Sequence, residues 1–163
     1  AHRRTEAAIL EGTKDLISRK GISGLSMIEI ADHSEVSRAT LYNHYRDKNA
    51  VISALITAEV EYMIEFANKA GTPADALEKL SIYISSDTAL AAMRVHDQSA
   101  LTSALAHADH PLYLEIARCL YGATKSEAGT GVAMRWLIGQ VMQPLSAKQS
   151  REQAELLVDR TLF

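Results

Sequence analysis

Residues 36–48, VSRATLYNHYRDK, concentrate hydrogen-bond donors and cationic groups around a short apolar skeleton. Ser37 is a residue type that caps helices, because its hydroxyl can accept a hydrogen bond from a free N–H of the first turn. The residues after it predict a two-turn helix over about residues 38–44, with Leu41 facing inward. Most of its other side chains can then bond a base edge or a phosphate.

A second short helix is predicted just before this stretch. Ser26 opens the sequence SMIE, a Ser-x-x-Glu capping box in which Glu29 can bond back to the backbone of the cap. The helix then covers about residues 27–33. Two short helices joined by a tight turn form a helix-turn-helix, whose second helix can lie in the major groove of DNA.

The second helix offers specific groups for DNA. Arg38 can form a fork onto guanine O6 and N7, Asn43 can pair with adenine, and Ala39 can touch a thymine methyl group. Further groups are suited to phosphates, either through side chains or at the starts of helices: Thr40, Tyr42, His44, Lys48, Ser26 and Ser37. In the alternative interpretation the charged residues are merely solvated and Tyr42 belongs to the core.

Helical periodicity continues through the rest of the chain, and no segment alternates as a strand does. A long helix is predicted from about residue 47 to 69, with one buried stripe formed by Val51, Leu55, Ala58, Tyr62 and Phe66. Further helices follow, with a break expected near His96–Asp97 and a restart at Pro111. The predicted fold is therefore all-α, with a small N-terminal helical domain and a larger helical body.

Composition limits the function classes. The 163 residues carry a formal net charge of -3, but residues 1–50 hold eight Lys/Arg against seven Asp/Glu and the remainder nine against thirteen. Only the N-terminal part therefore suits a polyanion. The single cysteine, Cys119, excludes an internal disulfide, and no apolar run approaches the length of a membrane span. With no signal peptide visible, a cytoplasmic location is expected.

The sequence shows no catalytic constellation. A glycine-rich phosphate loop and a Cys/His nucleophile pattern are both missing, so neither catalytic residues nor a cofactor is predicted. His107, Asp109 and His110 in HADHP have side chains that bind metals, but no further cluster supports them. A loop and helix cap is the favoured interpretation, and no metal site is predicted.

The stretch IADHSEVSRATLYNHYRDKNAVISAL, residues 30–55, resembles the helix-turn-helix signature of the TetR family of bacterial transcriptional regulators. The resemblance covers about residues 4–66, and its matching elements are Ile30–Ala31, Val36–Ser37, Thr40–Leu41–Tyr42, His44–Tyr45, Lys48 and Val51. The family usually has glycine where this chain has Glu35. We expect Glu35 either to adopt a left-handed conformation or to mark a different turn.

The resemblance implies a non-enzymatic homodimer that binds a palindromic DNA operator as a repressor and is released by a small-molecule effector. Residues 1–46 would form the DNA-binding domain, and residues 47–163 the helical effector-binding and dimerisation domain. The last two helices would pair with those of the second copy, through Met134, Leu137, Ile138, Val141, Leu157, Val158 and Thr161. Alternatively, these apolar faces only close the core of the subunit.

An effector pocket would draw on the large side chains of the body, although such residues also form ordinary cores. They are Tyr62, Met63, Phe66, Tyr83, Met93, His96, Tyr113 and Trp136. Two other functions remain open from the sequence. One is a small helical enzyme or ligand carrier with an incidental helix-turn-helix, and the other is a family member that activates transcription or needs no effector.

Overall fold

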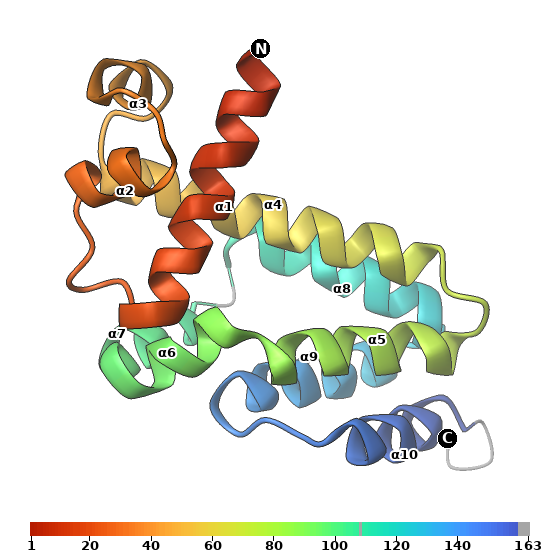
Figure 1. Cartoon of the computed structure of the whole chain (residues 1–163). Helices are drawn as coiled ribbons and strands as arrows, with labels where there is room; N and C mark the ends of the chain where they lie inside the picture. The colour runs from red at the N-terminus through yellow and green to blue at the C-terminus, as the bar shows by residue number, and fades with distance from the viewer. Residues whose placement is uncertain (108, 160–163) are drawn as a thin grey trace. The chain divides into compact units, whose positions relative to one another are not determined.

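The computed structural model describes residues 1–107 and 109–159, and within these ranges it contains ten helices and no strand (Figure 1). The helices are α1 (His2–Lys20), α2 (Met27–His33), α3 (Arg38–His44), α4 (Lys48–Asn68), α5 (Pro73–Ser86), α6 (Thr88–His96), α7 (Gln98–Leu105), α8 (Pro111–Thr124), α9 (Glu127–Met142) and α10 (Ala147–Val158). The all-α prediction is confirmed.

The chain packs into two compact units. The first comprises Ala1–Glu59 and Thr88–Ala104, and the second comprises Val60–Asp87 and the described residues from Leu105 onward. Helices α6 and most of α7 therefore pack with the N-terminal helices rather than with the rest of the body. The predicted domains, residues 1–46 for DNA binding and 47–163 for effector binding and dimerisation, are defined by function rather than by packing. This division stays a prediction.

The first unit is held together by one apolar core. Helix α1 buries Ile9, Thr13 and Ile17, which recur every four residues and so lie on one face. They pack with buried residues of α2, α3 and α4. Leu41 is the residue that α3 contributes to this core, and it is 0% exposed, which confirms its predicted inward orientation.

A buried carboxylate ties the end of α1 to the break between α6 and α7. The backbone N–H groups of Ile22 and Ser23 donate to the two carboxylate oxygens of Asp97 at 2.7 and 2.9 Å. Burial raises the pKa of Asp97, but these hydrogen bonds outweigh it and the pKa is lowered overall. Gly21 has φ 78°, and a Cβ there would collide with Asp97, so only glycine fits. The predicted break at His96–Asp97 is confirmed.

The second unit forms its own core from α5, α8, α9, α10 and the end of α4. Its buried residues are Ala67, Leu77, Leu80, Leu120, Ala133, Met134, Leu137 and Ala154. The Ser81 hydroxyl is within hydrogen-bond distance of Gln140 Oε1 (2.5 Å) and of the Ser150 hydroxyl (2.6 Å), so α5, α9 and α10 share a buried polar network.

Helix α4 departs from its predicted buried stripe. Tyr62 is 55% exposed, whereas Val60 and Ala67 are buried, so the single stripe through Tyr62 was wrong. The cause is that residues 48–59 belong to the first unit and residues 60–68 to the second. Each unit buries its own side of the helix, and the buried face therefore shifts along it.

Candidate nucleic-acid interface

The helix-turn-helix starts with the predicted capping box. The backbone N–H of Glu29 donates to Ser26 Oγ at 3.2 Å, and the backbone N–H of Ser26 donates to Glu29 Oε2 at 3.0 Å. The Lys20 ammonium also bonds Glu29, which lowers the pKa of that carboxyl. The expectation that the Ser26 N–H is free to bind a phosphate was therefore wrong, because Glu29 already occupies it.

The turn between α2 and α3 explains the unusual residue at position 35. Helix α2 ends in a Schellman motif, in which the N–H of Glu35 bonds the carbonyl of Asp32 and the N–H of Val36 bonds the carbonyl of Ala31. This motif places Glu35 in the left-handed region, with φ 56°. Of the two expectations for Glu35, the structure therefore adopts the left-handed one. Val36 then packs against the core, which fixes where α3 begins.

Helix α3 exposes the residues predicted to read bases. Arg38, Ala39 and Asn43 face solvent, and Tyr42 is 54% exposed, which excludes its alternative placement in the core. Because α3 is only two turns long and buries Leu41, its open side carries Arg38, Tyr42 and Asn43.

The start of α3 is capped as predicted. Ser37 Oγ accepts the backbone N–H of Thr40 at 3.0 Å and lies 2.7 Å from the Thr40 hydroxyl. Both hydroxyl groups lie at the N-terminal end of the helix, where Ser37 is exposed and Thr40 is half-buried. Their contact with phosphate stays a prediction.

The side chains of His44 and Lys48 are turned toward other parts of the protein. The side chain of His44 is 8% exposed, and its ring stacks on the ring of His2 with centroids 4.3 Å apart. Its predicted contact with a phosphate does not fit this position, because the ring points toward α1. Lys48 is half-buried and donates to the backbone carbonyl of Ile22 at 3.3 Å. It braces the turn after α1, and its predicted phosphate contact remains a prediction.

Two cationic residues that the sequence did not single out lie near α3. Arg3 and Arg4 are exposed in the first turn of α1. The stacking of His2 on His44 brings this turn to the C-terminal end of α3. The sequence shows the basic run His-Arg-Arg at residues 2–4. Only the packing of α1 shows that this run lies beside α3.

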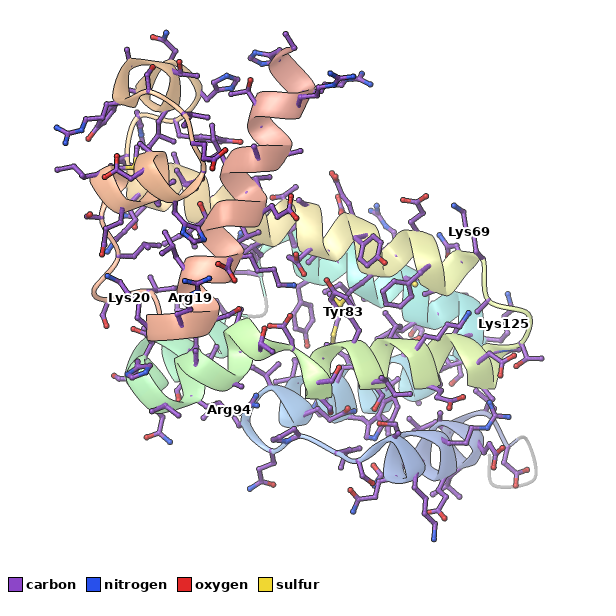
Figure 2. All side chains as sticks on the ribbon, viewed as in Figure 1. Arg19, Lys20, Lys69, Tyr83, Arg94 and Lys125 are labelled. Carbon is purple, nitrogen blue, oxygen red and sulfur yellow. The ribbon has the colours of Figure 1, made fainter. Side chains whose placement is uncertain are left out.

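Several other cations of the first unit are neutralised by carboxylates. Lys14 pairs with Glu59 at 2.8 Å, and Arg19 pairs with Asp15 at 2.8 Å. Figure 2 shows Arg19 and Lys20 at the C-terminal end of α1, the end away from His2. Among the residues that the structure describes, Arg38 is exposed and forms no ion pair. The cationic charge on α3 is therefore available to an external anion.

The residues predicted to form an effector pocket are only partly brought together. Tyr62, Phe66 and Tyr83 form an aromatic cluster with ring centroids 5.4–5.6 Å apart, and Figure 2 labels Tyr83 on α5. Met63, Tyr113 and Trp136 also belong to the second unit, whereas Met93 and His96 belong to the first.

The second unit also has a hollow of about 240 Å³ that uses other residues. It lies among α4, α5 and α8, beside Ala67, Leu77 and Cys119, and none of the eight predicted pocket residues lines it. The Cys119 thiol is half-buried, and burial raises its pKa. The placement of an effector pocket therefore stays a prediction.

The residues predicted for a dimer interface occupy different depths. Met134 and Leu137 are buried in the core of the second unit. The others are partly exposed: Ile138, Val141, Leu157 and Val158. Thr161 lies outside the described residues. The same two helices carry exposed apolar side chains that the sequence did not single out, Val132 (49% exposed) on α9 and Leu156 (57%) on α10.

Two smaller expectations have a structural answer. His110 caps α8, since its Nδ1 accepts the backbone N–H of Leu112 at 3.2 Å, and this confirms the helix-cap interpretation of HADHP.

Among the described residues, no helix is both long and apolar enough to cross a membrane.

The capped α2, the Schellman turn and the exposed polar face of α3 define a helix-turn-helix DNA-binding protein. Residues 9–55 match the family model described as bacterial regulatory proteins, tetR family. Residues 9–55 therefore form a helix-turn-helix DNA-binding domain of the kind found in these regulators. The match covers the helix-turn-helix and its flanking helices, and the rest of the chain lies outside it. A search of curated proteins found no match.

Proposed function

We propose that this protein is a dimeric repressor that binds a palindromic operator through α3 and leaves it when a small-molecule effector binds. The observation that carries the proposal is that α3 buries Leu41 and exposes Arg38, Ala39, Tyr42 and Asn43. Two such helices, one from each copy, would enter successive major grooves about 34–36 Å apart. The protein acts by binding rather than by catalysis.

The DNA part of the proposal assigns roles to individual residues. Arg38 and Asn43 read bases, while Tyr42, Thr40 and Lys48 hold phosphates. We add Arg3 and Arg4 as phosphate contacts, because they are exposed beside the C-terminal end of α3. His44 and Ser26 are left out, because their polar groups already face other groups of the protein.

Binding to DNA from the protein's own promoter region, titrated at several salt concentrations, tests these roles. We expect Arg38→Ala to lose about 1–3 kcal/mol of discrimination at one base pair. Lys48→Ala should weaken all sequences alike and reduce the salt slope by about one phosphate contact. Lys79→Ala, on the exposed side of α5, is the control and should change neither. An Arg38→Ala loss that is equal on every base variant would contradict base reading.

Exposed apolar residues on α9 and α10 support the dimer. Leu156 and Val132 present apolar surface on the two helices that the family resemblance assigns to dimerisation. We expect Leu156→Glu to shift the protein toward monomer in sedimentation equilibrium. Leu114→Glu, on α8 and similarly exposed at 56%, is the matched control. If both variants, or neither, change the mass, the dimer does not use α10.

The effector part rests on the aromatic cluster of Tyr62, Phe66 and Tyr83, which offers ring faces to an apolar ligand. A ligand that binds one conformation more tightly shifts the protein toward it and can lower its affinity for DNA. Screening small molecules for thermal stabilisation together with release of DNA tests this. Compounds that stabilise the protein without releasing DNA would contradict the regulatory role of that binding.

A further inference from the structure

Three side chains that bind metals meet where α1 and α3 touch. His2 and Glu6 lie one turn apart at the start of α1, and His44 is the last residue of α3. His2 Nε2 is 3.2 Å from Glu6 Oε1, and His44 Nδ1 is 3.6 Å from the same oxygen. One ligand atom from each residue lies within 4.8 Å of the other two.

The buried nitrogen of His44 lacks a hydrogen-bond partner. His44 Nδ1 is inaccessible to solvent and makes no hydrogen bond. Its distance of 3.6 Å to Glu6 is too long for one. Buried polar atoms in proteins almost always have a partner, so this nitrogen requires an explanation. It faces a carboxylate and a second imidazole, which is the arrangement of a metal-ligand set.

We propose that His2, Glu6 and His44 bind a divalent transition-metal ion of the zinc type. In a tetrahedral site with metal–ligand bonds of about 2.0–2.2 Å, neighbouring ligand atoms lie about 3.3–3.6 Å apart. The separations of 3.2 and 3.6 Å are close to this range. Two imidazole nitrogens favour zinc-type ions over magnesium and calcium, which prefer oxygen ligands. Three protein ligands leave the fourth position for water.

A simple ion pair accounts less well for the same contacts. If His44 were protonated and paired with Glu6, the charge-assisted bond would close to about 2.7–2.9 Å. If His2 were protonated as well, two cationic rings would stack with their centroids only 4.3 Å apart. A metal ion instead needs both imidazoles neutral, and it satisfies the His44 nitrogen and the carboxylate together.

Metal uptake by the chain with any affinity tag removed tests the site without DNA. Competition of Zn²⁺ with a coloured chelator should give one ion per chain, and Co²⁺ should produce the visible absorption bands of tetrahedral coordination. Glu6→Gln and His44→Gln should each weaken binding at least about tenfold. The matched control is His96→Gln, an exposed histidine of the same unit, and it should keep full affinity.

Two results would overturn the metal site. One is the absence of Zn²⁺ uptake by the wild-type chain. The other is unchanged affinity in both Glu6→Gln and His44→Gln, with their circular dichroism spectra showing that they remain folded. Glu6→Gln serves as the second variant in case His44→Gln disturbs the packing of α3, because Glu6 lies on the more exposed side of the cluster.

The site also predicts an effect on DNA binding, and this step rests on the proposed function. A divalent cation at the end of α3 offsets the charge of Glu6 and adds positive charge near the phosphates, so it should tighten operator binding several-fold. His44→Gln should remove the dependence on Zn²⁺. If Zn²⁺ binds but operator affinity does not change, the metal site is upheld and its coupling to DNA is refuted.

Discussion

Replacing Glu35 by glycine should make the protein more stable. Glu35 occupies the left-handed position of the Schellman motif that ends α2, with φ 56°. In this conformation the Cβ of an L-residue crowds the backbone, and glycine is the residue that most often occupies the position. The side chain is exposed, so Glu35→Gly removes strain without leaving a cavity.

The expected gain is the difference between two effects of opposite sign. A left-handed conformation costs an ordinary residue about 1–2 kcal/mol. Glycine offsets about 0.5–1 kcal/mol of this gain, because it loses more conformational entropy on folding than other residues do. The net stabilisation should be about 0.5–1 kcal/mol, or about 1–4 °C in melting temperature for a chain of this size.

Urea unfolding of three variants isolates the backbone effect. Glu35→Gln removes the charge but keeps the Cβ, so it should not gain this stability. Lys125→Gly is the matched control in the second unit, because Lys125 ends α8 with the same φ of 56° and should gain a similar amount. Equal stability of the Gly and Gln variants at position 35 would refute the strain argument. Operator binding should tighten equally in both, since each removes the same carboxylate.

Three further predictions follow from buried groups. Leu41→Ala should lower the free energy of unfolding by about 2–5 kcal/mol in urea titration, because Leu41 is fully buried; a loss well below this would contradict its role as the anchor of α3. Asp97→Asn should cost about 1–3 kcal/mol at neutral pH, because the amide can accept from only one of the Ile22 and Ser23 N–H groups without turning a donor toward the other. The folded-state pKa of Asp97 is lowered, so its contribution to the free energy of unfolding is present above about pH 4 and is lost as the pH falls through that lower pKa. The free energies of unfolding of wild type and Asp97→Asn, plotted against pH, should therefore converge in acid, and parallel plots would refute this. Finally, burial raises the pKa of Cys119, so alkylation of its thiol at neutral pH should be slower in the folded protein than in urea.

The sequence predicted the fold well because most of its signals are local. The capping box at Ser26, the cap at Ser37 and the break at Asp97 each depend on residues a few positions apart. The buried stripe of α4 failed for a non-local reason. One helix serves two cores, and a periodic pattern cannot show that its buried side changes near residue 60.

The interface was predicted less evenly. The exposure of Arg38 and Asn43 could be predicted from the sequence, because Leu41 fixes which side of α3 faces inward. Spacing cannot show which polar groups already have partners elsewhere. The N–H of Ser26 donates to Glu29, and Lys48 donates to the carbonyl of Ile22 at the start of the α1–α2 connection. The sequence could therefore assign phosphate roles to these groups, but it could not show their partners within the protein.

The partners of His44 could not be predicted, because they lie far from it in the sequence. Within the helix-turn-helix its position suggests a phosphate contact, yet its partners, His2 and Glu6, come from the first turn of α1. The pair His2 and Glu6, four residues apart on one helix face, is visible in the sequence, but nothing local indicates that a third ligand comes from α3. Since the last residue of α3 packs against α1, the orientation of α3 depends on α1. In the proposed DNA complex, the bases are read by the residues before His44. In the proposed complex, a metal ion that draws His44 and Glu6 together would therefore act on DNA recognition without touching DNA.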